Sequence, residues 1–269
     1  MKVYFSSRLK APSLFTALDA NNIAYGFIEN TRDIWVRDFM PVKVRNVMPK
    51  TNKSEKYISF RYEPSYLANE PKLRTDYKTD IAAQFPELSV IYDSLNLDGG
   101  NIVFSPSRCK AIVSDRVFAE NPLYNHSRLI AKLSQRLRAE IIIIPALPPK
   151  DDTTGHADGM VRFVDENTVI GNGTGDKHEE EIKAVLSKHG IITVDFPYFE
   201  SRGISAVGCY INFLETENHI FLPVFEVDMQ KDNAAVALTE KLFKKKVVPV
   251  NINQIAAKGG ALNCVSWEL

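Results

Sequence analysis

Apolar and polar positions repeat in a fixed order of predicted elements along much of the chain. Short apolar runs at Ile102–Phe104 and Ala111–Val113 predict a hairpin. A helix is predicted over residues 127–140, where apolar residues recur every three or four positions. The continuous apolar run Ile141–Ile144 then predicts a buried strand. The resulting unit is two strands, a helix and a further strand.

The same order recurs after and before this stretch. The first later unit has strands at Met160–Val164 and Thr168–Gly171, a helix over 177–189 that ends at Gly190, and a strand at Ile191–Phe196. The second has strands at Cys209–Leu214 and His219–Phe225, a helix over 232–245 and a strand over 247–251. The earlier unit comprises Phe39–Val44, Tyr57–Tyr62, a helix over 75–84 and a strand over 89–92. The near-constant spacing of the leading strands is typical of a radial or stacked repeat.

A fifth unit is divided between the two ends of the chain. Leu262–Leu269 supplies a leading strand, and the N-terminal region supplies strand Lys2–Ser6, a helix over 12–21 and a strand over 24–29. Pairing of the terminal segments would close a ring of five α/β units and remove exposed sheet edges. We therefore expect one α/β domain over residues 1–269.

Composition narrows the function classes. The 33 basic and 33 acidic residues balance, which argues against a general nucleic-acid or anionic-membrane binder. No apolar run approaches the roughly 20 residues of a membrane helix, and the N-terminus lacks the apolar core of a signal peptide. We expect a cytoplasmic protein. Three cysteines do not make a disulfide framework.

Polar side chains recur where the leading strands begin. In an extended backbone His156 and Asp158 of Gly155-His156-Ala157-Asp158 would point to the same side. The equivalent places in the other units hold Asp38 after Trp35, Asp98 before a glycine pair, Asn212 and Cys264. Each of these alone also fits a structural role, such as a turn cap or a small buried side chain. Together, around one axis, they predict a site.

The residue types limit the chemistry of that site. Metal binding is disfavoured, because only His156 stands out as a ligand and the usual zinc spacings are absent. A protease-like Cys–His pair stays possible but leaves the carboxylates unexplained. A guanidinium substrate explains them, because its planar fork of donors matches carboxylates. Trp35 could cover the cation, and the bound charge would lower the pKa of the Cys264 thiol.

The motifs occur in the order of a known family. Trp35-Val36-Arg37-Asp38, Asp98-Gly99-Gly100, Gly155-His156-Ala157-Asp158, Tyr210-Ile211-Asn212-Phe213 and Gly259-Gly260 with Cys264 resemble the agmatine deiminase and bacterial-type peptidylarginine deiminase group of the guanidino-modifying superfamily. The resemblance covers roughly residues 30–269. It implies a pentein fold, an α/β-propeller of five ββαβ-type units around a pseudo-fivefold axis.

The resemblance also implies roles for the residues. Cys264 would be the nucleophile, Asp38 and Asp158 would hold the guanidinium, and His156 would transfer protons. Asn212 would be a supporting polar group, Trp35 a wall of the pocket, and no metal or cofactor would be needed. We expect Asp98 and Asn212, with Trp35, Asp38 and Asp158, to be the substrate-binding residues. The chain differs from agmatine deiminases at Phe39-Met40-Pro41, at Asn263 and after Cys264.

Those differences leave the substrate open between an agmatine-like compound, free arginine and an arginyl peptide. Two further functions also stay open at this point. One is a catalytically silent pentein that binds a cationic guanidino ligand or partner. The other is an amidinotransferase, in which an amine rather than water accepts the intermediate.

Overall fold

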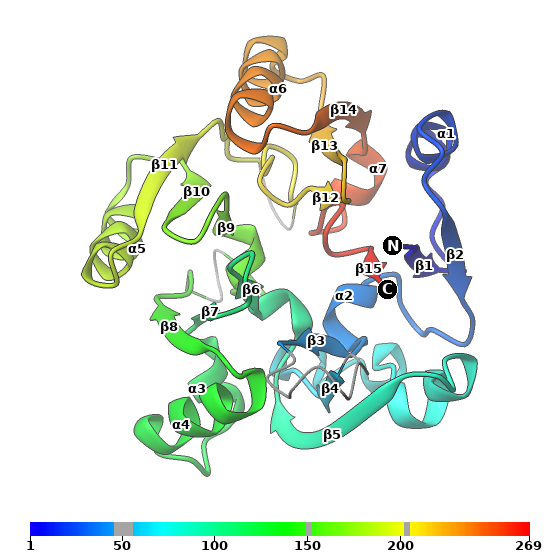
Figure 1. Cartoon of the computed structure of the whole chain (residues 1–269), viewed down its shortest axis with the longest axis vertical. Coiled ribbons are helices and arrows are strands. Elements are labelled where there is room, and N and C mark those ends of the chain that lie inside the picture. Colours follow the sequence, from blue (N-terminus) through cyan, green and yellow to red (C-terminus); the bar gives the residue numbers. More distant parts are fainter. Residues whose placement is uncertain (46–55, 149–151, 202–204) are drawn as a thin grey trace.

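Five separate three-stranded sheets surround the middle of the molecule (Figure 1). The computed structural model describes residues 1–45, 56–148, 152–201 and 205–269. Four sheets have one order, in which a central strand pairs antiparallel with the strand before it and parallel with the strand after it. The predicted repeat of two strands, a helical connection and a further strand is therefore present.

The strands of each sheet follow one another in the chain, except in the sheet formed by the two ends. Four sheets contain β3 (Val42–Val44), β4 (Lys56–Arg61) and β5 (Ser89–Asn96); β6 (Val103–Phe104), β7 (Lys110–Ser114) and β8 (Glu140–Ile144); β9 (Val161–Phe163), β10 (Thr168–Asn172) and β11 (Ile192–Phe196); and β12 (Leu214–Glu215), β13 (His219–Val224) and β14 (Lys246–Asn251). The fifth sheet contains β1 (Val3–Ser6), β2 (Tyr25–Ile28) and β15 (Trp267–Glu268).

The two ends of the chain pair as expected. Val3 and Tyr4 of β1 lie antiparallel to Glu268 and Trp267 of β15. The amide of Lys2 donates to the carbonyl of Leu269 at 2.7 Å, and the amide of Leu269 donates back at 2.9 Å. The five sheets nevertheless stay separate, and the described residues form no single closed sheet.

The longer helices lie on the outside of the ring (Figure 1). They are α1 (Pro12–Ala20), α4 (His126–Leu137), α5 (Lys177–Lys188) and α6 (Met229–Phe243). Asn125, Asp176 and Asp228 accept a hydrogen bond from the third residue after them, so each caps the start of its helix. α4 packs three fully buried leucines, at positions 129, 133 and 137, against the adjoining sheet. The apolar face predicted for this helix is therefore buried against the sheet.

The structure corrects several predicted elements. The predicted helix over 75–84 is a π-helical turn, η3 (Tyr77–Ile81), followed by a 3-10 turn, η4 (Ala82–Gln84). The leading strands are shorter than predicted, and short helices that periodicity did not predict are α2 (Val36–Phe39), α3 (Arg116–Glu120) and α7 (Asn253–Ala256). In the described part of the chain, no helix is both long and apolar enough to span a membrane.

Candidate active site

The polar residues at the unit starts lie in turns before the leading strands, not on them. Asp38 lies in α2, whereas Asp98 precedes the 3-10 turn η5 (Gly99–Asn101). His156 precedes a second 3-10 turn, η6 (Ala157–Gly159), which contains Asp158. The expectation that these two residues share an extended strand is therefore wrong. Their side chains still face one place, because both come within 3.4 Å of a Cβ built on Gly100.

His156 lies between two carboxylates. Its Nε2 is 2.8 Å from Asp98 Oδ2, and its Nδ1 is 3.6 Å from Asp38 Oδ1. Burial alone would lower the pKa of His156, but Asp38, Asp98 and then Asp158 outweigh it and raise the pKa to about 10. The three carboxylates therefore favour the imidazolium form of His156 at neutral pH.

Asp38 is held by a backbone donor and is costly to ionise. The amide of Gly100 donates to its Oδ1 at 3.1 Å. Burial raises the pKa of Asp38 to about 7; Asp98 and Asp158 add to this rise, whereas His156 opposes it. A cation placed here would find carboxylates whose charge is only partly balanced by the protein.

The glycine pair after Asp98 lets these groups approach. A Cβ on Gly99 would lie 2.1 Å from the carbonyl oxygen of Arg37. A Cβ on Gly100 would lie 2.6 Å from Asp38 Oδ1 and 2.7 Å from His156 Nδ1. All three distances are too short for a Cβ contact, so the turn needs glycine at both positions for close approach.

Cys264 and Asn212 complete the cluster. Cys264 Sγ lies 3.2 Å from Asn212 Oδ1 and 3.8 Å from Asp158 Oδ2. Asn212 also accepts from the amide of Cys264 and donates to the carbonyl of Asp158. Burial, then Asp158 and Asp38, raise the pKa of the Cys264 thiol well above its usual range. Burial and the carboxylates therefore favour a protonated thiol, which a bound cation would acidify.

Trp35 stands beside the turn that carries the thiol. A Cβ on Gly260 would lie 2.5 Å from its indole ring, so the glycine lets the ring pack closely. The amide of Arg37 donates to the carbonyl of Cys264 at 3.1 Å, which joins α2 to this turn. Trp35 is only half-buried, so part of its surface stays open to a ligand.

Three residues that sequence reasoning did not assign contact the cluster or its neighbours. Tyr66 donates its hydroxyl to Asp98 Oδ2 at 2.8 Å, and nothing in the sequence around Tyr66 signals this. Asn263 donates to Asp158 Oδ2 at 2.6 Å, and its position next to Cys264 was a usable signal. Arg162 donates to Asn263 Oδ1 at 3.2 Å, and its charged side chain between the buried Val161 and Phe163 was a second usable signal in the sequence.

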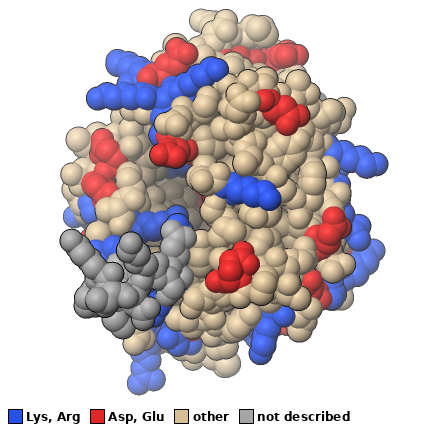
Figure 2. All heavy atoms as spheres, turned by 45° about the vertical axis from the view of Figure 1, so that its right-hand side comes forward, with Lys and Arg blue, Asp and Glu red and all other residues tan. Residues whose placement is uncertain are grey.

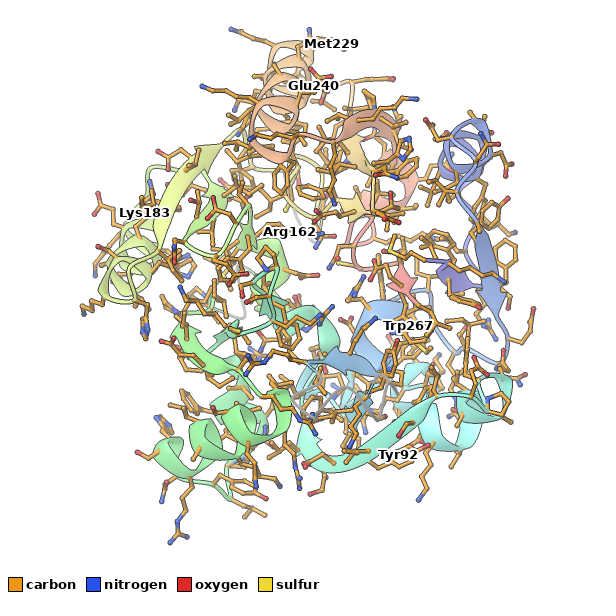
Figure 3. The ribbon with its side chains drawn as sticks, in the orientation of Figure 1. Tyr92, Arg162, Lys183, Met229, Glu240 and Trp267 are labelled. Carbon is orange, nitrogen blue, oxygen red and sulfur yellow. The ribbon has the colours of Figure 1, made fainter. Side chains whose placement is uncertain are left out.

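The site is polar and lies toward the middle of the molecule. Figure 3 shows Arg162 pointing from β9 into the space that the elements surround, whereas Lys183 on α5 lies at the rim. On the face in Figure 2, basic and acidic side chains are interspersed, with no broad patch of one sign. Within the described residues, no group of three or more His, Cys, Asp or Glu side chains is placed to hold a metal ion.

Solved structures with the same fold come from deiminases. An agmatine deiminase from C. jejuni with substrate bound is 18% identical, with a TM-score of 0.73, and the match covers 99% of this chain and 92% of that one. An agmatine deiminase of Enterococcus faecalis is 15% identical, with a TM-score of 0.79 and the same coverage. These likenesses establish a shared fold.

A comparison with curated protein sequences finds no match. In contrast, the sequence model of the Porphyromonas-type peptidyl-arginine deiminases matches residues 16–269, nearly the whole chain. That match includes each turn that brings a side chain to the cluster around His156. By this extended match, the chain belongs to the Porphyromonas-type peptidyl-arginine deiminase family.

Proposed function

We propose that this protein is a guanidino deiminase that forms a covalent intermediate on Cys264. The observation that carries the proposal is the cluster of one half-buried thiol with a buried imidazolium and three buried carboxylates, in which Cys264 Sγ lies 3.8 Å from Asp158 Oδ2. Three carboxylates surround one imidazolium, and the neighbouring Arg37 is paired with Glu268, so the cluster carries an excess of acidic groups. Such a site favours a planar, permanently charged guanidinium.

Binding prepares the nucleophile. Asp38 and Asp158 accept hydrogen bonds from the guanidinium nitrogens, and Trp35 covers the group. The positive charge compensates the carboxylates that keep the Cys264 pKa high, so the thiol loses its proton more readily with substrate bound. The protein thus withholds the reactive thiolate until a cation is present.

Two steps complete the reaction. The Cys264 thiol first releases its proton to water, because His156 is already protonated. Sγ then forms a bond to the guanidinium carbon, the C–N bond to one amino group breaks, and His156 gives its proton so that ammonia leaves. The neutral imidazole then takes a proton from water, whose oxygen attacks the same carbon. The S–C bond breaks, which gives a ureido product and returns the thiol. The raised pKa of His156 suits the first of these tasks, because the residue begins protonated.

The other side chains serve these groups. Asp98 holds His156 through Nε2, and Asn212 holds both Cys264 and the backbone of Asp158. We further propose that the five sheets and the paired ends form a pentein propeller around this site. The substrates to test first are agmatine, free arginine and arginyl peptides, since agmatine deiminases share the fold.

The test is an assay of ammonia and ureido product with each compound. We expect turnover of at least one, and its loss in Cys264→Ala. Absence of turnover of every guanidino compound, with Cys264→Ala indistinguishable from the wild type, would refute the proposal. Adding amines distinguishes amidino transfer, because a transferase would form a new guanidino product in place of the ureido product.

A further inference from the structure

Asn263 has a bond for every polar group, and one of those bonds goes to the carboxylate beside the thiol. Its Nδ2 donates to Asp158 Oδ2 at 2.6 Å. Its main-chain carbonyl accepts from Arg37 Nε at 3.2 Å, and its main-chain amide donates to the main-chain carbonyl of Asn212 at 3.1 Å. The side chain is 8% exposed, so water cannot replace these partners freely.

Arg162 sets which way the Asn263 amide faces. Arg162 Nη1 donates to Asn263 Oδ1 at 3.2 Å, and guanidinium nitrogens can only donate. The oxygen of the amide must therefore face Arg162, which leaves the NH₂ group to face Asp158. Asp158 favours the same orientation, because a carboxylate accepts from the NH₂ group and repels the amide oxygen. Arg162 therefore anchors the far side of the amide and keeps its NH₂ group directed at Asp158.

Arg162 is itself fixed from three sides. Its Nη1 donates to the carbonyl of Phe213 at 3.0 Å, its Nη2 pairs with Glu215 Oε2 at 3.1 Å, and its guanidinium lies 4.4 Å from the centre of the Phe213 ring. Lys245 also bonds to Glu215, at 3.0 Å. The charge of Arg162 is thus balanced by Glu215 and not by Asp158.

We propose that Arg162 and Asn263 are a positioning pair that holds Asp158 in the orientation that receives a cationic group in front of Cys264. The donor that reaches Asp158 is a neutral amide, so the carboxylate is oriented while its charge stays available for a ligand. Neither residue contacts the thiol in this proposal; both act through Asp158. The inference rests on the proposed function, since it concerns the same guanidinium site.

The experiment compares two reagents of nearly equal shape that alkylate Cys264. Chloroacetamidine is a cation, whereas chloroacetamide is neutral, so the ratio of their rate constants reports how well the carboxylates orient a cation before the thiol. We expect a high ratio in the wild type. Asn263→Leu, which keeps the size but not the donor, should lower the ratio by about tenfold. Arg162→Leu should lower it as well, and Arg162→Lys should restore part of it.

A double variant tests whether the two residues act as one unit. If Arg162 acts through Asn263, adding Arg162→Leu to Asn263→Leu should change the ratio little further. Asn121→Leu is the matched control, because Asn121 is equally buried and fully bonded but makes its bonds to Val117 and Asn96. We expect that variant to lose stability without changing the ratio.

The outcomes separate this inference from the proposed function. No preference for the cation in the wild type would overturn the proposed guanidinium site itself. A preference in the wild type that persists in Asn263→Leu and in Arg162→Leu would overturn the positioning pair alone. If Asn263→Leu does not fold, the comparison of Arg162→Leu with Arg162→Lys decides the question.

Discussion

The protonation states of Cys264 and His156 depend on burial and on the charge of the nearby carboxylates. The two effects act in the same direction at Cys264 and in opposite directions at His156. For Cys264, burial and nearby carboxylates both favour the neutral thiol. For His156, burial favours the neutral ring, but the carboxylates are close enough to prevail. The groups of the protein itself therefore favour a thiol beside an imidazolium. This pairing differs from a thiolate–imidazolium pair, because the carboxylates stabilise the protonated His156 while Cys264 stays protonated as well.

The state of His156 can be measured directly. Because the pKa of His156 is raised to about 10, we expect the imidazolium to persist at pH 8 and to lose its proton only as the pH rises through about 10. Side-chain nitrogen NMR of labelled histidine gives the titration, and His156→Gln assigns the signal. Asp38→Asn removes the strongest carboxylate influence, so it should lower the midpoint. A midpoint near 6.5, as in an unperturbed histidine, would contradict this account.

Cys264 should respond to pH in a way that depends on the charge of its reagent. Alkylation by chloroacetamide should rise through an apparent pKa above the roughly 8.5 of a free cysteine. Alkylation by chloroacetamidine should begin at lower pH, because its charge offsets that of Asp158 and Asp38. Mass spectrometry of the modified peptide separates Cys264 from Cys109 and Cys209. Identical pH profiles for the two reagents would show that the carboxylates do not control the thiol.

At the scale of elements, short turns bring the reactive groups together, and their glycines are not equivalent. Gly99 closes against the backbone of Arg37, whereas the three atoms nearest to a Cβ on Gly100 belong to the side chains of Asp38, His156 and Asp158. Gly159, at the end of η6, has no atom within 4 Å of an added Cβ. Gly99 is thus required for backbone packing and Gly100 for the approach of the site side chains, whereas Gly159 has room for a methyl group.

This difference gives a graded prediction for three alanine substitutions. Gly99→Ala should lower the free energy of unfolding by about 1–3 kcal/mol, because backbone must move to admit the methyl group. Gly100→Ala should mainly reduce turnover, since it pushes Asp38 and His156 apart. Gly159→Ala should preserve both properties and serves as the control. Urea unfolding and the ammonia assay measure the two effects; an active Gly100→Ala enzyme would refute the geometry given for this turn.

The repeat of elements was predictable from the sequence, whereas the local form of the site was not. Apolar spacing predicted the four longer helices α1, α4, α5 and α6, because their packing faces recur every three or four residues, but it wrongly predicted a helix over 75–84. The apolar run Cys209–Leu214 was predicted as a strand, but residues 210–213 form a turn before β12. Burial alone does not distinguish the two. The bond from Tyr66 to Asp98 depends on packing between distant segments, which no local pattern carries.

At the scale of the whole molecule, the chain ends support the site. β15 follows the Cys264 turn by three residues and pairs with β1. Arg37, next to Asp38, places its Nη2 on both carboxylate oxygens of Glu268 at 2.6 and 2.8 Å. The same strand that joins the two termini thus also joins the thiol turn to α2. Loosening the terminal sheet should therefore disturb residues that lie far from it in the sequence.

The two tryptophans of the chain allow this coupling to be tested with one kind of substitution. Trp267 is 3% exposed, lies 5.3 Å from the ring of Phe85 and donates its Nε1 to the carbonyl of Pro41 at 2.8 Å. Trp267→Ala should therefore lower the free energy of unfolding by about 3–5 kcal/mol. Trp35 is half-buried at the site, so Trp35→Ala should cost less stability and more turnover.

Trp267→Phe refines the comparison, because it keeps an aromatic ring while removing the bond to Pro41. It should recover most of the stability lost in Trp267→Ala, together with the turnover that depends on the Cys264 turn. Urea unfolding and the ammonia assay, applied to all three variants, give the result. Equal losses of stability in Trp35→Ala and Trp267→Ala would contradict the separation of roles. Full turnover in a destabilised Trp267→Ala protein would show that the terminal sheet holds the fold without holding the thiol.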